Sequence, residues 1–80
     1  MSEEEILAVF TRILRDLLID DSIVLKMDTR RQDVPNWDSM AYISFIVAAE
    51  GELAMKFKLA EVDSFETVGD IVAVARARLP

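Results

Sequence analysis

Only two glycines and two prolines interrupt the 80 residues of this chain, so few positions favour tight turns. A β-sandwich or β-barrel contains many short strands, and these are joined by turns rich in glycine and proline. Hydrophobic residues make up 52% of the sequence, which is too apolar for a disordered chain. The composition therefore favours a small helical domain, and a chain of this length supports only one core.

Apolar residues recur at intervals of three and four in separate segments, as expected for helices with one buried face. The spacing predicts three long helices over about residues 3–17, 38–53 and 67–79, and a short helix near residues 60–63. Ser2 with Glu5, and Thr67 with Asp70, have the spacing of capping boxes at the first and last of these helices. The predicted fold class is all-α, a four-helix bundle that forms a single domain over residues 1–80.

The second predicted helix is apolar around much of its circumference. Such a helix is either enclosed on several sides or presents an apolar surface to a partner. The spacing assigns its core stripe to Met40, Ile43, Ile46, Val47 and Leu53.

A long loop over about residues 19–37 connects the first two predicted helices. A loop of this length is normally functional, or is held in place by a few buried side chains. We expect Ile23 or Leu25 to provide that anchor. Pro35 favours an extended conformation at Val34 and prevents a helix from running through this point.

The composition also excludes several classes of function. Cysteine and histidine are absent, which removes disulfides, thiolate nucleophiles, imidazole bases and the usual zinc ligands, so no metal site is predicted. The net charge of −6 disfavours binding to nucleic acid. No apolar run approaches the roughly 20 residues that span a bilayer, and the N-terminus does not have the pattern of a signal peptide. We therefore expect a soluble, cytoplasmic monomer without a membrane or nucleic-acid partner.

Ser39 is the residue that stands out as a candidate for chemistry. With Asp38 as the N-cap of the second helix, Trp37 can contact Tyr42 as a hydrophobic staple. Ser39 then occupies the first helical position, where its hydroxyl can face solvent and the helix end favours a phosphodiester. Taken alone, the Asp-Ser pair favours a simple helix start over a site of chemistry. Without a histidine or a nearby lysine to activate it, Ser39 can react only if another protein activates it.

Together these segments resemble the acyl carrier protein family over essentially the whole chain. The triplet Asp38-Ser39-Met40 lies where the family has its Asp-Ser-Leu signature, and a short third helix follows Phe57. The segment Thr67-Val68-Gly69-Asp70-Ile71 resembles the start of the family's last helix. The resemblance implies an acyl-carrier-like four-helix bundle that is a carrier and not an enzyme.

The resemblance also implies a cofactor and partners. Ser39 would carry 4′-phosphopantetheine, which a phosphopantetheinyl transferase donates from coenzyme A. Asp38 would help to hold the Mg²⁺ ion in the transferase complex. The thiol of the arm would then carry an acyl group as a thioester and present it to acyl-loading and acyl-transferring enzymes.

Two departures from the common family pattern indicate a specialised pathway. Members that act in fatty-acid synthesis typically have acidic residues along the second helix, whereas this chain has Ala41 and Ser44 there. We therefore infer partners that dock through apolar contacts, with Trp37, Met40, Phe45 and Val47 as the candidate docking residues. Burial of Phe45 against the long loop is an equal alternative.

The second departure is Trp37 itself, directly before the Asp-Ser pair. The sequence Trp-Asp-Ser resembles freestanding carriers of secondary-metabolite, modified-sugar or polysaccharide pathways. An aminoacyl or peptidyl carrier of the same fold, loaded by an aminoacyl-loading enzyme, is an alternative function. A helical interaction module that is not a carrier is the alternative from a different class.

Overall fold

The computed structural model describes residues 1–80 and contains four α-helices and one short 3₁₀ helix. In chain order these are α1 (Glu3–Leu18), η1 (Arg31–Asp33), α2 (Ser39–Leu53), α3 (Leu59–Ser64) and α4 (Val68–Arg78). The predicted fold class is confirmed, and each predicted helix differs from the observed one by no more than one residue at either end. The sequence did not predict η1, because three residues are too few to show a helical period.

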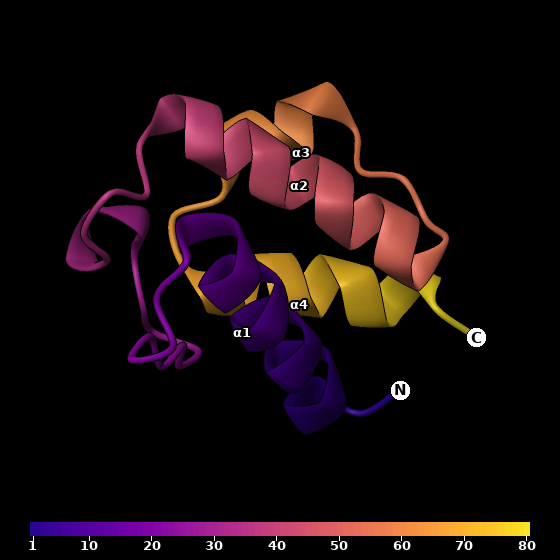
Figure 1. Ribbon diagram of the computed structural model, residues 1–80. Helices are drawn as coiled ribbons and strands as arrows, with labels where there is room; N and C mark the ends of the chain where they lie inside the picture. Colours follow the sequence, from indigo (N-terminus) through magenta and orange to yellow (C-terminus); the bar gives the residue numbers. More distant parts are fainter.

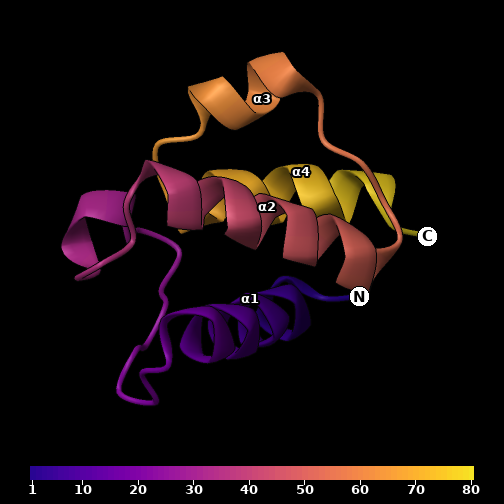
Figure 2. The same ribbon diagram turned by 45° about the horizontal axis from the view of Figure 1, so that its top comes forward.

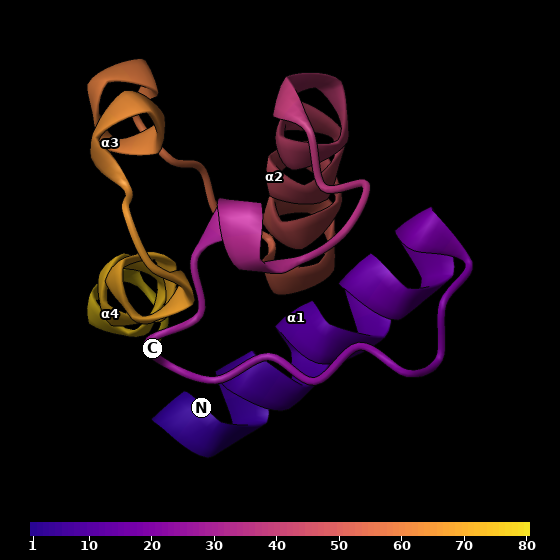
Figure 3. The same cartoon turned by 90° about the vertical axis from the view of Figure 1, so that its left-hand side faces the viewer.

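The three long helices surround one core, and α3 lies on the outer side between α2 and α4 (Figure 1). The two chain termini lie on the same side of the molecule, and the connection from α1 to η1 lies on the other (Figure 2). Seen from that side, this connection passes the end of α4 before it reaches η1 and α2 (Figure 3). None of the helices has both the length and the apolar character needed to cross a membrane.

Both predicted capping boxes are present. The hydroxyl of Ser2 accepts a hydrogen bond from the backbone N–H of Glu5 at 3.1 Å, and the Glu5 carboxylate accepts one from the N–H of Ser2 at 2.9 Å. Thr67 and Asp70 form the same reciprocal pair at the start of α4, at 3.2 Å and 3.1 Å. Each pair satisfies two N–H groups that have no partner within the helix, so the helix starts are determined locally.

The core consists of 18 buried residues, all of them hydrophobic. Phe45 lies at its centre with no exposed surface, and its ring contacts those of Phe10 and Trp37 edge-on with both centroid distances at 5.2 Å. Ile23 and Leu25 are both buried, which confirms that the long loop is anchored by these side chains. The loop is therefore part of the packed structure and holds η1 beside α2.

The predicted core stripe of α2 is partly wrong. Ile46 and Leu53 are buried as expected, but Met40, Ile43 and Val47 are 83%, 51% and 60% exposed. The buried side chains of α2 are Phe45, Ile46, Ala49 and Leu53. Because α2 is apolar on most of its surface, spacing alone could not tell which face packs against α1 and which faces outward.

The long loop is tied to the start of α4 through the backbone. The N–H groups of Val68 and Gly69 donate hydrogen bonds to the carbonyl oxygens of Thr29 and Met27, at 2.8 Å and 2.7 Å. A β-carbon on Gly69 would lie only 2.6 Å from the Met27 oxygen, which is a steric clash with the backbone. Glycine is required here because the two backbone segments approach so closely.

The two glycines of the chain therefore give opposite predictions. We expect Gly69→Ala to lower the free energy of unfolding by about 1–3 kcal/mol, because the methyl group forces the loop away from α4. Gly51 lies in α2 with no atom within 4 Å of the position of a β-carbon. Gly51→Ala should raise the free energy of unfolding by up to about 1 kcal/mol, because alanine is the better helix former. Urea denaturation measures the change in the free energy of unfolding for both substitutions. Equal effects of the two would contradict the close approach of Gly69 to the Met27 oxygen.

The helix caps also make the stability depend on pH. Hydrogen bonds from the N–H groups of Glu66 and Thr67 lower the pKa of Asp70 below its ordinary value of 3.8. Because the folded state holds this carboxyl deprotonated, the stabilisation is present above the ordinary pKa and is lost as the pH falls through the lowered one. The free energy of unfolding should therefore decrease below about pH 4, as measured by urea denaturation at a series of pH values. Asp70→Asn should make this decrease shallower, and an unchanged slope would exclude Asp70 as a contributor.

Candidate functional site

A tight turn before α2 points Trp37 inward and Ser39 outward. Pro35 and Asn36 are the central residues of this turn, which the hydrogen bond from the Trp37 N–H to the Val34 oxygen closes at 3.3 Å. Asn36 has a φ of 69°, and proline followed by asparagine at positive φ is the residue pattern of a type II turn. The sequence of this turn thus accounts for the abrupt change from a buried indole to an exposed helix start.

Asp38 caps α2, as predicted. Its Oδ1 accepts a hydrogen bond from the N–H of Ala41 at 2.9 Å, and its backbone oxygen accepts one from Tyr42 at 2.8 Å. Ser39 is the first residue of α2 and is exposed, and its hydroxyl takes part in none of the hydrogen bonds of the protein. The Ser39 hydroxyl is therefore not used to start the helix and is accessible for chemistry.

Trp37 packs against the first turn of α2 from the core side. The indole is 4% exposed and lies next to the Tyr42 ring, with centroids 6.2 Å apart, in the predicted staple position. Its Nε1–H is buried without a hydrogen-bond partner. Leaving a donor unpaired costs about 1–3 kcal/mol, which the contacts of the indole with Phe45 and Tyr42 must offset. Trp37 thus holds the turn against the core.

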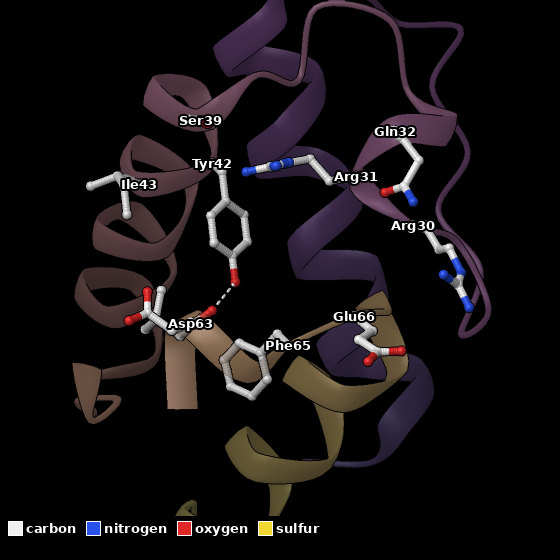
Figure 4. Close-up of a pocket in the computed structure, with 10 residues that line it drawn as sticks. Arg30, Arg31, Gln32, Ser39, Tyr42, Ile43, Asp63, Phe65 and Glu66 are labelled. Carbon is white, nitrogen blue, oxygen red and sulfur yellow. Dashed lines mark hydrogen bonds between the residues drawn. The ribbon is translucent and has the colours of Figure 1, made fainter. Parts of the chain in front are cut away.

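A groove opens directly beside Ser39. Its volume is about 410 Å³, and its walls come from η1, from α2 and from the region of α3 (Figure 4). The lining residues are Arg30, Arg31, Gln32, Ser39, Tyr42, Ile43, Val62, Asp63, Phe65 and Glu66. Its size falls in the range of small-molecule binding sites.

Tyr42 forms the middle of this groove and links α2 to α3. Its hydroxyl donates a hydrogen bond to the backbone oxygen of Val62 at 2.8 Å, and the guanidinium of Arg31 lies 5.4 Å from the centre of its ring. Burial raises the pKa of the Tyr42 hydroxyl, and the nearby Arg31 opposes this change. The hydroxyl therefore stays protonated as a donor at neutral pH, and the position of the ring is fixed.

The structure divides the four predicted docking residues into two pairs. Met40 and Val47 are exposed on the outer face of α2 and are accessible to a partner. Trp37 and Phe45 are buried in the core at 4% and 0% exposure, so the prediction that they dock a partner is wrong. The alternative, burial of Phe45, is confirmed. The Phe45 ring packs against Trp37 at the end of the long loop and also against Phe10 of α1. Both aromatic rings are therefore part of the hydrophobic core.

Sequence patterns did not identify Arg31 as a site residue. It is brought to Ser39 and Tyr42 by the path of the long loop, which no local spacing reveals. Tyr42 could have been found, because it lies three residues after Ser39 and so shares a helix face with it.

Comparisons with known proteins agree with this geometry. No family model matches the chain. The chain is 32% identical over 79 residues to the acyl carrier protein MbtL of Mycobacterium sp. (strain MCS). The aligned region covers 99% of this chain and 89% of that protein. Among solved structures, it is similar to the NMR structure of a holo acyl carrier protein from Geobacter metallireducens, with a TM-score of 0.82 and 35% identity. This match covers 90% of the present chain and 83% of the other.

Proposed function

Because this chain belongs to the acyl carrier protein family, we propose that Ser39 is the residue on which it carries its 4′-phosphopantetheine. The observation that supports this most directly is that the residue that caps α2 is not the residue that exposes a free hydroxyl there. Asp38 makes the capping hydrogen bond, whereas the exposed Ser39 hydroxyl makes none. Members of this family are carriers and not enzymes, so the role of the serine is to be modified and to present cargo.

The residues at the helix start fit a phosphodiester. Ser39 lies at the positive end of a helix of 15 residues, and the guanidinium of Arg31 is close by above the Tyr42 ring. When attached, the arm supplies a thiol that carries acyl groups as thioesters, a function that this cysteine-free chain cannot perform alone. The chain itself contributes the attachment point, its accessibility and the charge around it.

Attachment requires a phosphopantetheinyl transferase. In the transfer, Ser39 Oγ forms the new bond to the phosphate that bears pantetheine, its proton passes to a base of the transferase, and the nucleotide part of coenzyme A leaves. Asp38 uses Oδ1 for the cap, so Oδ2 is the oxygen that can help to hold Mg²⁺ beside the phosphates. Asp38 thus serves both the helix and the transfer.

Partner enzymes that load and remove acyl groups are implied by the family. We propose that they dock on the apolar outer face of α2, defined by Met40, Ile43 and Val47. This face has no charged residue between Ser39 and Val47, so it suits an apolar partner surface better than a basic one. Such a face supports a dedicated partner set in a specialised pathway. The cytoplasmic location and the monomeric state stay predictions from the sequence.

Mapping the modified residue tests the proposal. The purified protein is incubated with a broad-specificity phosphopantetheinyl transferase, Mg²⁺ and coenzyme A, and the product is fragmented in a mass spectrometer. We expect one pantetheinyl phosphate group on the peptide that contains Ser39. Absence of modification, or its location on Ser44 instead, would refute the assignment. Fragmentation of the protein isolated from its own cells would also identify the cargo and so distinguish an acyl carrier from an aminoacyl carrier.

A further inference from the structure

The charges around α2 are distributed unlike those of the chain as a whole. The segment 29–59 contains α2 and parts of the connections on either side, which lie at opposite ends of the helix (Figure 1). This segment has equal numbers of acidic and basic residues, so the net charge of −6 comes entirely from the rest of the chain. Its basic residues all lie outside the helix, two before α2 and two after it: Arg30, Arg31, Lys56 and Lys58.

The acidic residues of the segment 29–59 are all engaged within the protein. Glu52, near the end of α2, forms a salt bridge with an arginine of α1. Glu50 accepts a hydrogen bond from the N–H of Phe57 at 2.8 Å. Asp33 and Asp38 accept hydrogen bonds from backbone N–H groups at the starts of η1 and α2, both at 2.9 Å. A basic partner that approaches α2 would therefore meet no carboxylate of this segment without an internal contact.

The basic residues of the same segment are exposed and have no anionic partner. None of them takes part in the four salt bridges of the structure, whereas each arginine of α1 and α4 has a partner within the protein. Arg31 lies against the Tyr42 ring and close to the phosphodiester proposed at Ser39. Arg30, Lys56 and Lys58 are thus the cations available to a partner.

Between these two groups of cations lies the exposed apolar face of α2, formed by Met40, Ile43 and Val47. A helix of 15 residues is about 22 Å long, so cations at its two ends are too far apart to share one small anion. They suit an extended surface that covers the helix. Charges at the edge of an apolar contact select the partner, because like charges repel and opposite charges speed association.

From this arrangement we propose that the partner enzymes present an acidic surface to α2, with carboxylates around an apolar centre. This inference rests on the docking face proposed above for α2 and does not depend on the attachment at Ser39. The apolar centre covers the exposed face of α2. Carboxylates of the partner pair with Arg30 at one end of the helix, and with Lys56 and Lys58 at the other.

An anionic membrane is the other kind of surface that attracts apolar and basic residues together. The structure favours a protein. Asp63 and Glu66 are exposed across the groove from Arg30 and Arg31 (Figure 4), so a broad anionic surface would meet these acids as well. Tryptophan, which anchors many proteins at the membrane interface, is present only as Trp37 and is buried. A protein partner can place its carboxylates only where the cations are.

Peptide binding tests this charge preference without modification of Ser39. Two synthetic helical peptides have the same leucine face, flanked by glutamates in one and by lysines in the other, and each is titrated into ¹⁵N-labelled protein. At low ionic strength we expect the glutamate peptide to bind about tenfold more tightly than the lysine peptide. The amide resonances that shift should belong to α2 and to the connections at its ends. Arg30→Gln/Lys58→Gln, which removes one cation from each end, should abolish the preference.

Lys26→Gln/Arg76→Gln is the matched control, because it removes two exposed cations that lie outside the segment 29–59. It should keep the preference for the glutamate peptide. The proposal would be overturned if neither peptide bound, if the lysine peptide bound as tightly, if both double variants had the same effect, or if the shifts fell on other helices. Binding of the protein to vesicles of anionic lipid would overturn the choice of a protein partner. None of these results affects Ser39, which the loading experiment tests separately.

Discussion

Ser39→Ala removes all detectable modification by a phosphopantetheinyl transferase and leaves the stability of the protein unchanged to within about 0.5 kcal/mol. The modification is lost because no other residue offers a hydroxyl at the first position of α2 beside the Asp38 cap. The fold is retained because the Ser39 side chain is exposed and the cap belongs to Asp38. Intact-protein mass spectrometry and urea denaturation measure the two effects.

Ser44→Ala is the matched control for this experiment. Ser44 is also an exposed serine on α2, five residues further along the helix, and lies outside the groove. The variant should be modified as completely as wild type. If Ser39→Ala were still modified, or if Ser44→Ala were not, the attachment point would have to be sought on a different face of α2.

Phe45→Ala should destabilise the protein by about 3–5 kcal/mol, which is the usual cost of removing a buried aromatic ring. A domain of 80 residues has a total stability of only about 4–12 kcal/mol, so a large part of it is lost. The effect is this large because Phe45 has no exposed surface and contacts both Phe10 and Trp37. Urea denaturation followed by the fluorescence of Trp37, the single tryptophan, provides the measurement.

Val47→Ala, two residues along the same helix, is the comparison. Its side chain is 60% exposed, so the expected loss of stability is only about 0.5 kcal/mol. If Phe45→Ala does not fold at all, Phe45→Leu keeps most of the side-chain volume and should cost less than about 1.5 kcal/mol. A Phe45→Ala variant as stable as Val47→Ala would mean that the ring is a surface docking residue after all.

The helix boundaries and the Ser39 position could be predicted because they depend on neighbours in the chain. Ser2 with Glu5 and Thr67 with Asp70 satisfy the first N–H groups of their helices within three residues. Asp38 does the same for α2 through Ala41, which leaves Ser39 at the first helical position. Residue identity and spacing carry all of this information, so the tertiary structure only confirmed it.

The predictions that failed concern residues whose environment is set by distant segments. On α2, apolar side chains point in nearly all directions, and only the packing of α1 decides that Phe45 is buried while Met40 and Val47 are exposed. Trp37 was predicted to face a partner, but the turn at Asn36 directs its ring into the core beside Phe45. The spacing of residues within one helix does not reveal where a second helix packs against it.

By itself, then, the sequence determined the fold class, the ends of the helices and the exposed serine at the start of α2. These features result from hydrogen bonds and periodicity that act over a few residues. Only the tertiary structure decided which face of α2 is free and that Arg31 lies over Tyr42 beside Ser39. Both depend on the path of the long loop, which Ile23, Leu25 and the close contact at Gly69 hold in place through contacts distant in sequence.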